Sequence, residues 1–278
     1  MTAVAFDSAT PVMGVCVSTP QATVVSSLSV GLEHGTRLAP LIAGALEQAG
    51  VGADEVDLVV CGIGPGSFTG TRIGIAIALG LTAGGRGLIG VSGLDAAGHR
   101  LRFFPGVVVP LVDARKGRLY AALYRSGRRL TGFLDESPDR IRERLRAYQA
   151  VLLTGPAAPG LHAAWDADHG VALDPGAGQA GAAALLDVGV QRFSRQAVRR
   201  VIPRPAYLRP SEAELARPGP SPPTVRGLPK AGAEGTGNSS LLRCLAGGPG
   251  SGAHRKNPGE GGGGAKNRAP RAGKLGAY

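Results

Sequence analysis

A glycine-rich stretch followed by a charge-free helical segment constrains this chain more than any other feature. Residues 62–74 read GIGPGSFTGTRIG and follow a strand-like apolar run over 56–61. A strand, a glycine turn and a helix in this order direct backbone N–H groups at the helix N-terminus, which suits an anion. Residues 73–83 carry no charged side chain, so a helix here is expected to be covered on every side. Another subunit is one candidate for the second cover.

The glycine loop has two interpretations. It lacks the Lys-Ser/Thr ending of a P-loop and the spacing of the dinucleotide-binding Gly-x-Gly-x-x-Gly, so it is a weak motif. The alternative is that its glycines only permit a tight turn and close helix–strand packing. Gly70, Gly74 and Ala78 recur at i, i+4 and i+8, a small-residue stripe that would let another helix approach closely. We favour this structural role over a catalytic one.

The basic charge of the chain is unevenly distributed. The 278 residues, enough for one large domain or two small ones, carry a formal charge of +11. Residues 216–278 hold 10 Lys and Arg against 2 Asp and Glu, whereas residues 1–215 hold 21 against 18. The basic character therefore belongs to the tail, and any RNA contact by the body is expected to be local or indirect.

The tail, residues 216–278, contains 16 Gly and 8 Pro and almost no apolar periodicity. Such a segment cannot bury enough surface to offset its chain entropy, and it is predicted to be disordered. Translation out of frame from a GC-rich gene is a second explanation of its composition. A third function, nonspecific binding of tRNA through the spaced basic residues, stays open as a weak alternative.

Cysteine usage and hydropathy predict a cytoplasmic protein. Cys16, Cys61 and Cys244 are odd in number and form no Cys-x-x-Cys pair, as expected for thiols in a reducing compartment. The N-terminus lacks a basic region followed by an apolar one, so no signal peptide is predicted. Apolar runs are too short or too glycine-rich for a membrane span, and no membrane association is expected.

The periodicity of apolar residues predicts alternating strands and helices, hence an α/β layered fold. Strands are expected within 2–30 and over 56–61, 87–91, 107–112, 119–124 and 151–153, and helices over 36–49, 70–83, 137–148 and 179–194, with another opening after Ser92. The expected divisions are an N-terminal lobe over 1–103, a second lobe over 104–195, a segment over 196–215 that returns to the first lobe, and the tail.

Five short segments carry further information. They read AFDSAT at 5–10, GPGSFTGTRIG at 64–74, GVSGL at 90–94, DARKGRLY at 113–120 and PAYLR at 205–209. Together they resemble the TsaB (YeaZ) family over residues 1–215, and the GPGSFTG-x-R run is specific for this group and its relatives. The tail has no counterpart in the resemblance.

The resemblance implies a two-lobed fold of the actin, Hsp70 and sugar-kinase type, in which helices flank a mixed sheet in each lobe. It also implies a role in making N6-threonylcarbamoyladenosine next to the anticodon of tRNAs that read codons starting with A. In such systems TsaD carries the transferase site, the metal and the nucleotide, TsaB is its dimerisation partner, and the ATPase TsaE is the third member. The chain is then expected to reach tRNA only through the complex, and to form a homodimer when alone.

The residues themselves argue against independent catalysis. TsaD-type catalysis places two histidines at i and i+4 on one helix, but here His34 is followed at that spacing by Leu38, and no His-Glu-x-x-His occurs. Ser67 is not in a Gly-x-Ser-x-Gly elbow, so a peptidase activity is poorly supported. We predict no catalytic residue, no metal and no cofactor.

Two hypotheses follow for the functional residues. As a noncatalytic subunit, the chain would bind TsaD through the helices over 36–49 and 70–83, with an interface comprising Leu38, Leu41, Ile42, Ala45, Gly70, Gly74, Ile77 and Ala78. The alternative is a nucleotide-dependent ATPase or kinase that uses Asp7 and the 64–70 loop. Its expected anion contacts are Asp7, Ser8, Thr10, Gly66, Ser67 and Thr69.

The enzyme hypothesis is weakened at two points. Asp7 is also explained as a turn residue that accepts hydrogen bonds from nearby backbone N–H groups. Where a second phosphate-binding Asp-x-Gly motif is expected, the chain has Asp113, Ala114 and Arg115 instead. Ser67 and Thr69 stand at the loop–helix junction, where N-capping is the default role of a hydroxyl side chain.

Overall fold

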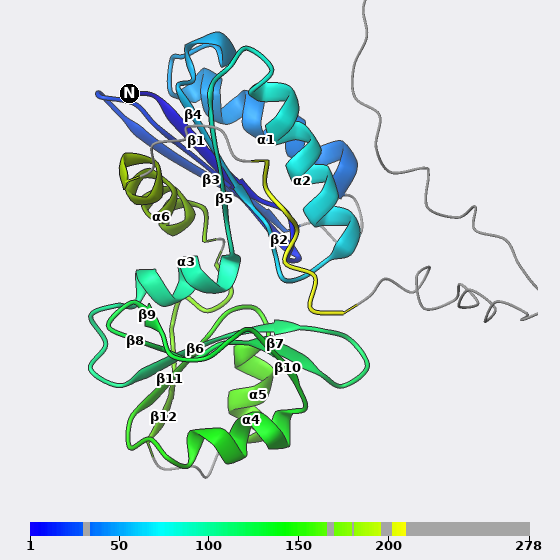
Figure 1. Ribbon diagram of the computed structural model, residues 1–278, viewed down its shortest axis with the longest axis vertical. Helices are drawn as coiled ribbons and strands as arrows, with labels where there is room; N and C mark the ends of the chain where they lie inside the picture. The colour runs from blue at the N-terminus through cyan, green and yellow to red at the C-terminus, as the bar shows by residue number, and fades with distance from the viewer. Residues whose placement is uncertain (30–33, 166–169, 180, 196–201, 210–278) are drawn as a thin grey trace, which may run out of the picture. The chain divides into compact units, whose positions relative to one another are not determined.

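The computed structural model describes residues 1–29, 34–165, 170–179, 181–195 and 202–209. They build two α/β lobes, each around its own sheet (Figure 1). The first sheet has the order β3-β2-β1-β4-β5. Its strands are β1 (Ala3–Asp7), β2 (Val12–Ser18), β3 (Thr23–Ser29), β4 (Leu58–Gly62) and β5 (Gly87–Val91). The first three strands form an antiparallel meander, and β4 and β5 continue the sheet in parallel with β1.

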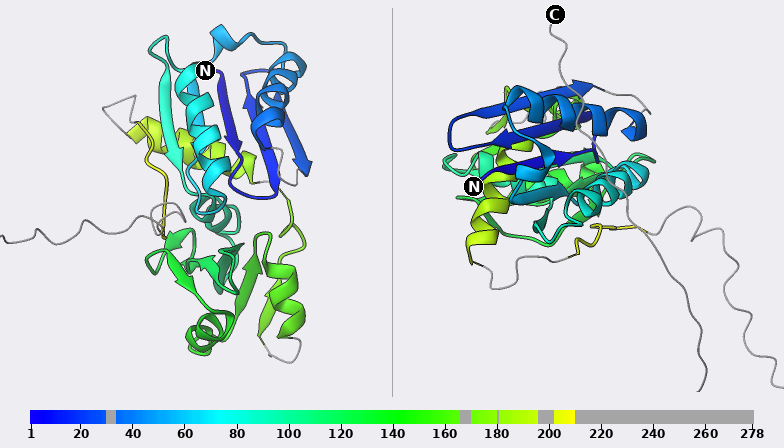
Figure 2. Two further views of the ribbon diagram at one scale, coloured as in Figure 1. Left: turned by 90° about the vertical axis from the view of Figure 1, so that its right-hand side faces the viewer. Right: turned by 90° about the horizontal axis from the view of Figure 1, so that it is seen from above.

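Side-chain alternation in β1 separates two cores in the first lobe. Val4 and Phe6 point to the face covered by α1 (His34–Gln48) and α2 (Phe68–Leu81). Ala3 and Ala5 point to the opposite face, which α6 (Ala182–Arg195) covers. The two views of Figure 2 show α1 and α2 on one side of the sheet and α6 on the other. A short 3-10 turn, Ala53–Glu55, leads from α1 into β4.

The second sheet is built around β6 (Val107–Asp113), in the order β10-β7-β6-β11-β12. The other strands are β7 (Leu119–Ala121), β8 (Tyr124–Arg125), β9 (Arg128–Arg129), β10 (Leu134–Glu136), β11 (Val151–Thr154) and β12 (Val171–Leu173); β8 pairs with β6 and with β9. Helices α4 (Pro138–Leu145) and α5 (Ala158–Ala164) cover one face of this sheet. Helix α3 (Gly93–Arg100) covers the other face and also packs against α6.

The position of α6 corrects the expected boundary of the second lobe at residue 195. Although α6 follows the second sheet in the chain, its apolar side chains pack on β1, β4 and β5 of the first. Leu185 and Val188 of α6 are buried there, and Gly189 lies so close to Val60 that a Cβ would collide with it. The second lobe therefore ends before residue 182.

Residues 202–209 run along the first lobe beside α2 (Figure 1). The Ala206 N–H donates to the Ile63 carbonyl oxygen over 2.8 Å, and the Tyr207 ring stacks on Phe68 with 4.6 Å between centroids. The predicted disorder of residues 216–278, together with Cys244, lies outside the described residues.

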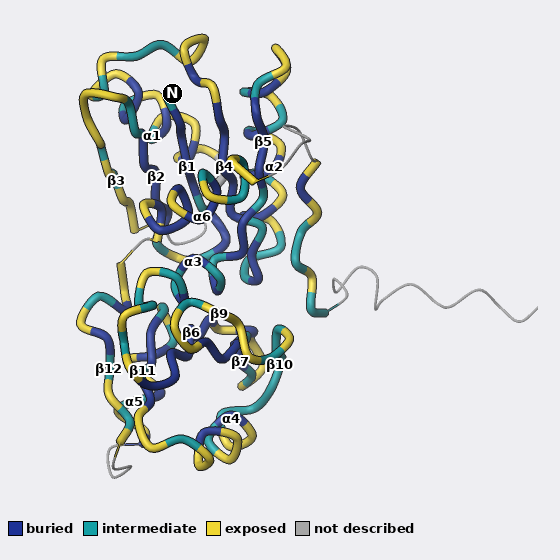
Figure 3. Tube along the Cα trace, turned by 60° about the vertical axis from the view of Figure 1, so that its left-hand side comes forward, coloured by how far each residue is buried: buried dark blue, intermediate teal, exposed yellow. Residues whose placement is uncertain are grey.

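Helix α2 is not covered on every side, contrary to the expectation from its composition. Arg72, Ala76 and Gly80 are exposed and Ile73 and Ile77 are half-buried, so an outer face remains (Figure 3). A single sheet can cover only one side of a helix, and the charge-free sequence leaves the other side apolar rather than buried. Within the described residues, no helix is both long and apolar enough to cross a membrane.

Candidate functional site

The glycine loop and the turn after β1 form one hydrogen-bonded junction. Ser67 is the N-cap of α2, and its hydroxyl accepts from the Gly70 N–H over 3.1 Å. The Ser67 N–H donates to the Ala9 carbonyl oxygen over 2.7 Å. The buried Ser8 hydroxyl donates to the Gly70 carbonyl oxygen over 2.9 Å. Thus the Ser67 N–H already binds the neighbouring turn, and the Gly70 N–H already binds the Ser67 side chain.

Two of the loop glycines are required by close packing. A Cβ at Gly66 would collide with the Ala9 carbonyl oxygen, and one at Gly70 would collide with that of Ser8. Backbone atoms cannot rotate away, so only glycine fits at these two positions. The interpretation of the glycines as packing residues therefore has direct geometric support.

The remaining residues of the expected anion site lie around the same turn. An oxygen of Asp7 accepts from the Ala9 N–H over 2.9 Å, the local turn interaction expected for an Asp at this place. The Thr10 hydroxyl donates to the Val12 carbonyl oxygen over 3.0 Å, and Thr69 is exposed in the first turn of α2. The six residues of the expected anion site are thus neighbours. The hydrogen bonds found for their hydroxyl and amide groups are made to other groups of the protein.

Asp7 and Thr10 line a cleft between the two lobes, where the enzyme hypothesis would place a nucleotide. The cleft encloses about 60 Å³. Ligand pockets are typically about 300–1,000 Å³, so a nucleotide has no room in this arrangement. Arg100 from α3 and Thr154 line this cleft; Arg100 forms an ion pair with Asp174, and both bind the Thr154 hydroxyl.

Asp174, which contacts the two lining residues Arg100 and Thr154, is held in its ionised form. Burial alone would raise its pKa, but hydrogen bonds from Thr154, the Gly176 N–H and Arg100 outweigh burial and lower the pKa below the ordinary value. A buried carboxylate with three donors is stable only while those donors stay in place. The network therefore fixes the positions of Arg100 and Thr154 in the cleft wall.

The Asp113–Arg115 turn is exposed and takes no part in lining this cleft. The Arg115 N–H donates to an oxygen of Asp113 over 2.7 Å, and the Arg115 and Asp113 side chains are 81% and 59% exposed. Neither residue lines the cleft. The nucleotide-dependent alternative thus gains no support from the second motif.

The small-residue stripe of α2 faces the interior of its own lobe. Ala78 is fully buried, and a Cβ at Gly74 would lie 2.9 Å from the Ser8 hydroxyl oxygen. This corrects the expectation that Gly70, Gly74 and Ala78 receive a partner helix: the close approach they permit is to the turn and sheet beneath them.

The apolar positions of α1 divide in the same way. Leu38, Ile42 and Ala45 are buried in the core of the first lobe, so they are not available to a partner. Of the eight expected interface residues, Leu41 and Ile77 keep part of their surface exposed. The periodicity of apolar residues identifies the buried face of a helix. A surface that binds a partner lies on the opposite face of the same helix.

The outer surface of the α1–α2 layer includes Leu41 and Ile77 from the expected interface, but its other residues were not predicted from the sequence. It is formed by small apolar residues that are exposed on both helices, namely Ala39, Pro40, Ala43, Ala76 and Gly80, with Leu41, Ile73 and Ile77 half-buried beside them. The sequence signal for this surface was the absence of charged residues from 73–83. An exposed helix face normally carries polar side chains, and the exposed face of α2 over these residues carries no charge.

Possible metal ligands and cysteine nucleophiles are the other side chains that could form a site. In the described part of the chain, no group of three or more His, Cys, Asp or Glu side chains is placed to hold a metal ion. The side chain of His34 lies outside the described residues. Cys16 and Cys61 are buried, and burial, with Asp187 and Asp7 respectively, raises their pKa values to about 11 and about 12. These thiols are therefore not activated nucleophiles.

Comparison with known proteins decides the family. The family model of TsaD, tRNA N6-adenosine threonylcarbamoyltransferase, matches residues 29–169, half of the chain. The chain belongs to the TsaD family. Within the family it is similar to TsaB proteins: it is 28% identical to TsaB of Bacillus subtilis over 45% of this chain and 56% of the relative, and 40% identical to TsaB of Escherichia coli over 34% and 42%. The chain thus spans about half the length of these curated relatives of the TsaD family.

The solved structures agree with this placement in the TsaD family. The structure of YeaZ from Pseudomonas aeruginosa matches with a TM-score of 0.60 and 27% identity, over 70% of this chain and 92% of that one. A second structure, described as similar to the peptidase YeaZ from Pseudomonas aeruginosa, matches with a TM-score of 0.63 over 75% and 99%. The expected two-lobed, actin-like α/β fold is confirmed.

Proposed function

We propose that this chain is the noncatalytic partner of TsaD in forming N6-threonylcarbamoyladenosine next to the anticodon of tRNA. In this proposal TsaD binds the outer surface of the α1–α2 layer, TsaE joins the pair, and tRNA is reached only through the complex. When TsaD is absent, the same surface pairs with a second copy. The similarity to TsaB proteins and membership of the TsaD family support the proposal.

The observation that carries it is the outer face of α2 beyond Arg72, which has no charged side chain over residues 73–81. Ala76 and Gly80 are exposed, Ile73 and Ile77 are half-buried, and no charged side chain interrupts the face between them. Small side chains let a facing helix approach closely, while the isoleucines supply apolar area. Exposed apolar surface of this kind indicates a protein interface.

The small volume of the cleft supports the noncatalytic part of the proposal. The cleft that would hold a nucleotide has a volume of about 60 Å³, and Arg100 in its wall is paired with Asp174. The glycine loop is likewise bound to the turn after β1. In this proposal the chemistry is therefore assigned to TsaD and the contact surface to this chain.

Charge placed on the outer face tests the proposal. Ala76→Arg should leave folding intact, because the side chain is already exposed, and should abolish a one-to-one complex with TsaD from the same source in size-exclusion chromatography with light scattering. Ala183→Arg, at an exposed position of α6 on the far side of the sheet, is the matched control and should bind normally. Ala78→Arg is unsuitable, since Ala78 is buried and the variant would unfold.

Circular dichroism separates a folded nonbinder from an unfolded protein. The proposal is wrong if the wild-type chain is folded and monodisperse but forms no complex with TsaD. The assignment of the surface is wrong if Ala76→Arg and Ala183→Arg bind TsaD equally well.

A further inference from the structure

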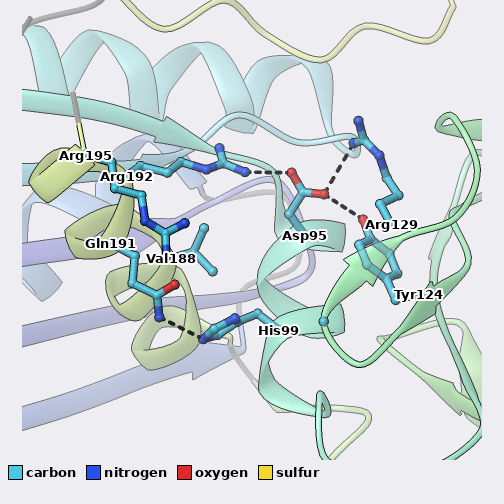
Figure 4. A pocket seen from close by; sticks show the side chains of 9 residues that line it. Asp95, His99, Tyr124, Arg129, Val188, Gln191, Arg192 and Arg195 are labelled. Carbon is cyan, nitrogen blue, oxygen red and sulfur yellow. Dashed lines mark hydrogen bonds and ion pairs between the residues drawn. The ribbon is translucent and has the colours of Figure 1, made fainter. Parts of the chain in front are cut away.

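A polar cavity lies apart from the glycine junction and the α1–α2 layer. It is formed where α3, α6 and the β8–β9 hairpin meet, and its volume is about 330 Å³ (Figure 4). Its lining residues are Asp95, His99, Tyr124, Gly127, Arg129, Val188, Gln191, Arg192 and Arg195. None of them was singled out as a site residue from the sequence, since they come from three separate segments.

A single carboxylate organises two of the arginines. One oxygen of Asp95 accepts from the Tyr124 hydroxyl over 2.8 Å and from Arg129 over 3.3 Å. The other oxygen accepts from Arg192 over 2.9 Å, and Arg192 also donates to the Gly90 carbonyl oxygen over 3.2 Å. Figure 4 shows the two guanidinium groups approaching Asp95 from opposite sides. Asp95 therefore fixes their positions at the cavity wall.

The lining carries more positive charge than Asp95 can balance. Three guanidinium groups face one carboxylate, which leaves two cations in excess. Burial and the nearby Arg102 lower the pKa of His99 while Asp187 opposes them, so the ring adds no charge at neutral pH; Gln191 contacts it over 3.4 Å. This excess positive charge lies in partly buried surroundings, because the Arg129 and Arg192 side chains are only 40% and 38% exposed.

Most N–H groups of the three arginines at the cavity have no acceptor in the part of the chain that the structure describes. Within the described residues, hydrogen bonds use two donors of Arg192, one of Arg129 and none of Arg195. Guanidinium groups bind phosphate and carboxylate oxygens through paired N–H groups, and such charge-assisted bonds are stronger than neutral ones. An oxyanion would supply both the missing acceptors and the missing negative charge.

We propose that this cavity binds a compact phosphate-bearing small molecule through Arg129, Arg192 and Arg195. Its volume is at the lower end of the typical range of about 300–1,000 Å³ for ligand pockets, which favours a small ligand. Val188 is the one aliphatic side chain in the lining, and the Tyr124 ring is buried against Gly98 with its hydroxyl turned to Asp95. The Tyr124 ring therefore offers no free face for a base, the Gln191 amide contacts the edge of the His99 ring, and the phosphate groups themselves are the recognised feature.

Calorimetry with inorganic pyrophosphate and orthophosphate, on the full chain at fixed ionic strength, tests this proposal. Wild type should bind pyrophosphate saturably and more tightly than orthophosphate, because the larger anion satisfies more donors. Arg195→Ala and Arg129→Ala should each weaken binding about tenfold or more, as expected for loss of a hydrogen bond to a charged group. Arg140→Ala is the matched control: Arg140 is 71% exposed on α4, pairs with Glu143, and should have no effect.

The outcomes are distinct. Absence of saturable binding overturns the proposal, and so does an equal loss in the Arg140 and Arg195 variants, which would indicate general attraction to a basic chain. A short RNA that binds more tightly than pyrophosphate, and loses affinity in the Arg195 variant, would overturn the small-molecule assignment in favour of RNA. Arg195→Ala should form the TsaD complex normally, so failure here is distinguishable from failure of the proposed function.

Discussion

Replacing Gly70 by alanine distinguishes a packing role of the glycine loop from a ligand-binding role. The added Cβ would overlap the Ser8 carbonyl oxygen, a backbone atom that cannot rotate away. Overpacking of this kind costs about 1–3 kcal/mol. Moving α2 outward to relieve the overlap would stretch the bond from the Ser8 hydroxyl to the Gly70 carbonyl, a further loss of about 0.5–1.5 kcal/mol.

The intrinsic helix preference acts in the opposite direction. Alanine is favoured over glycine in a helix by at most about 1 kcal/mol, and less near a helix end. The net expectation for Gly70→Ala is therefore a destabilisation of about 1–3 kcal/mol. Gly80, in the same helix, is exposed, and a Cβ added there would meet no atom within 4 Å, so Gly80→Ala should stabilise by up to about 1 kcal/mol.

Urea unfolding followed by circular dichroism measures both changes, and an unchanged m-value would show that the denatured state is comparable. The two variants should shift the unfolding midpoint in opposite directions. If Gly70→Ala is as stable as wild type, the close approach to Ser8 does not constrain this position, and the packing explanation of the loop is refuted.

Three further predictions follow from buried groups and from the C-terminal segment. The pKa of Asp174 lies below the ordinary 3.8 in the folded state, so its interactions stabilise the fold above pH 3.8 and are lost as pH falls through the folded-state pKa. The stability gap between wild type and Asp174→Asn, from urea unfolding, should thus be large at neutral pH and vanish in acid; a gap independent of pH would contradict this. Cys16 and Cys61 should resist iodoacetamide in the folded protein and react in urea, as read by peptide mass spectrometry; labelling of either under native conditions would refute their burial. Tyr207→Ala should speed hydrogen exchange at residues 202–209, whereas Tyr207→Phe should largely preserve protection, because the ring stacks on Phe68.

The candidate site was predictable in part. The GPGSFTG run indicated a strand–loop–helix junction, and Ser67 is the N-cap that the sequence indicates. The direction in which the small residues point was not predictable, since glycine at i and i+4 is equally compatible with a sheet and with a partner helix. Only the position of Ser8 against Gly70 and Gly74 decided between them. Similarly, the helix expected after Ser92 is present as α3, but the sequence does not show that the Asp95 carboxylate in its first turn binds Tyr124 and two arginines.

The sequence by itself determined the features that depend on neighbours along the chain. Apolar periodicity and cap residues are local, so β4, α1, α2 and β6 lie within two residues of their predicted bounds. Only the tertiary structure decided what depends on distant segments. Helix α6 packs on the first sheet rather than the second, short α5 and β12 were not predicted, and the arginine cavity gathers three segments whose separate patterns carry no common signal. Burial and charge compensation arise between segments, and no local pattern encodes which segments will meet.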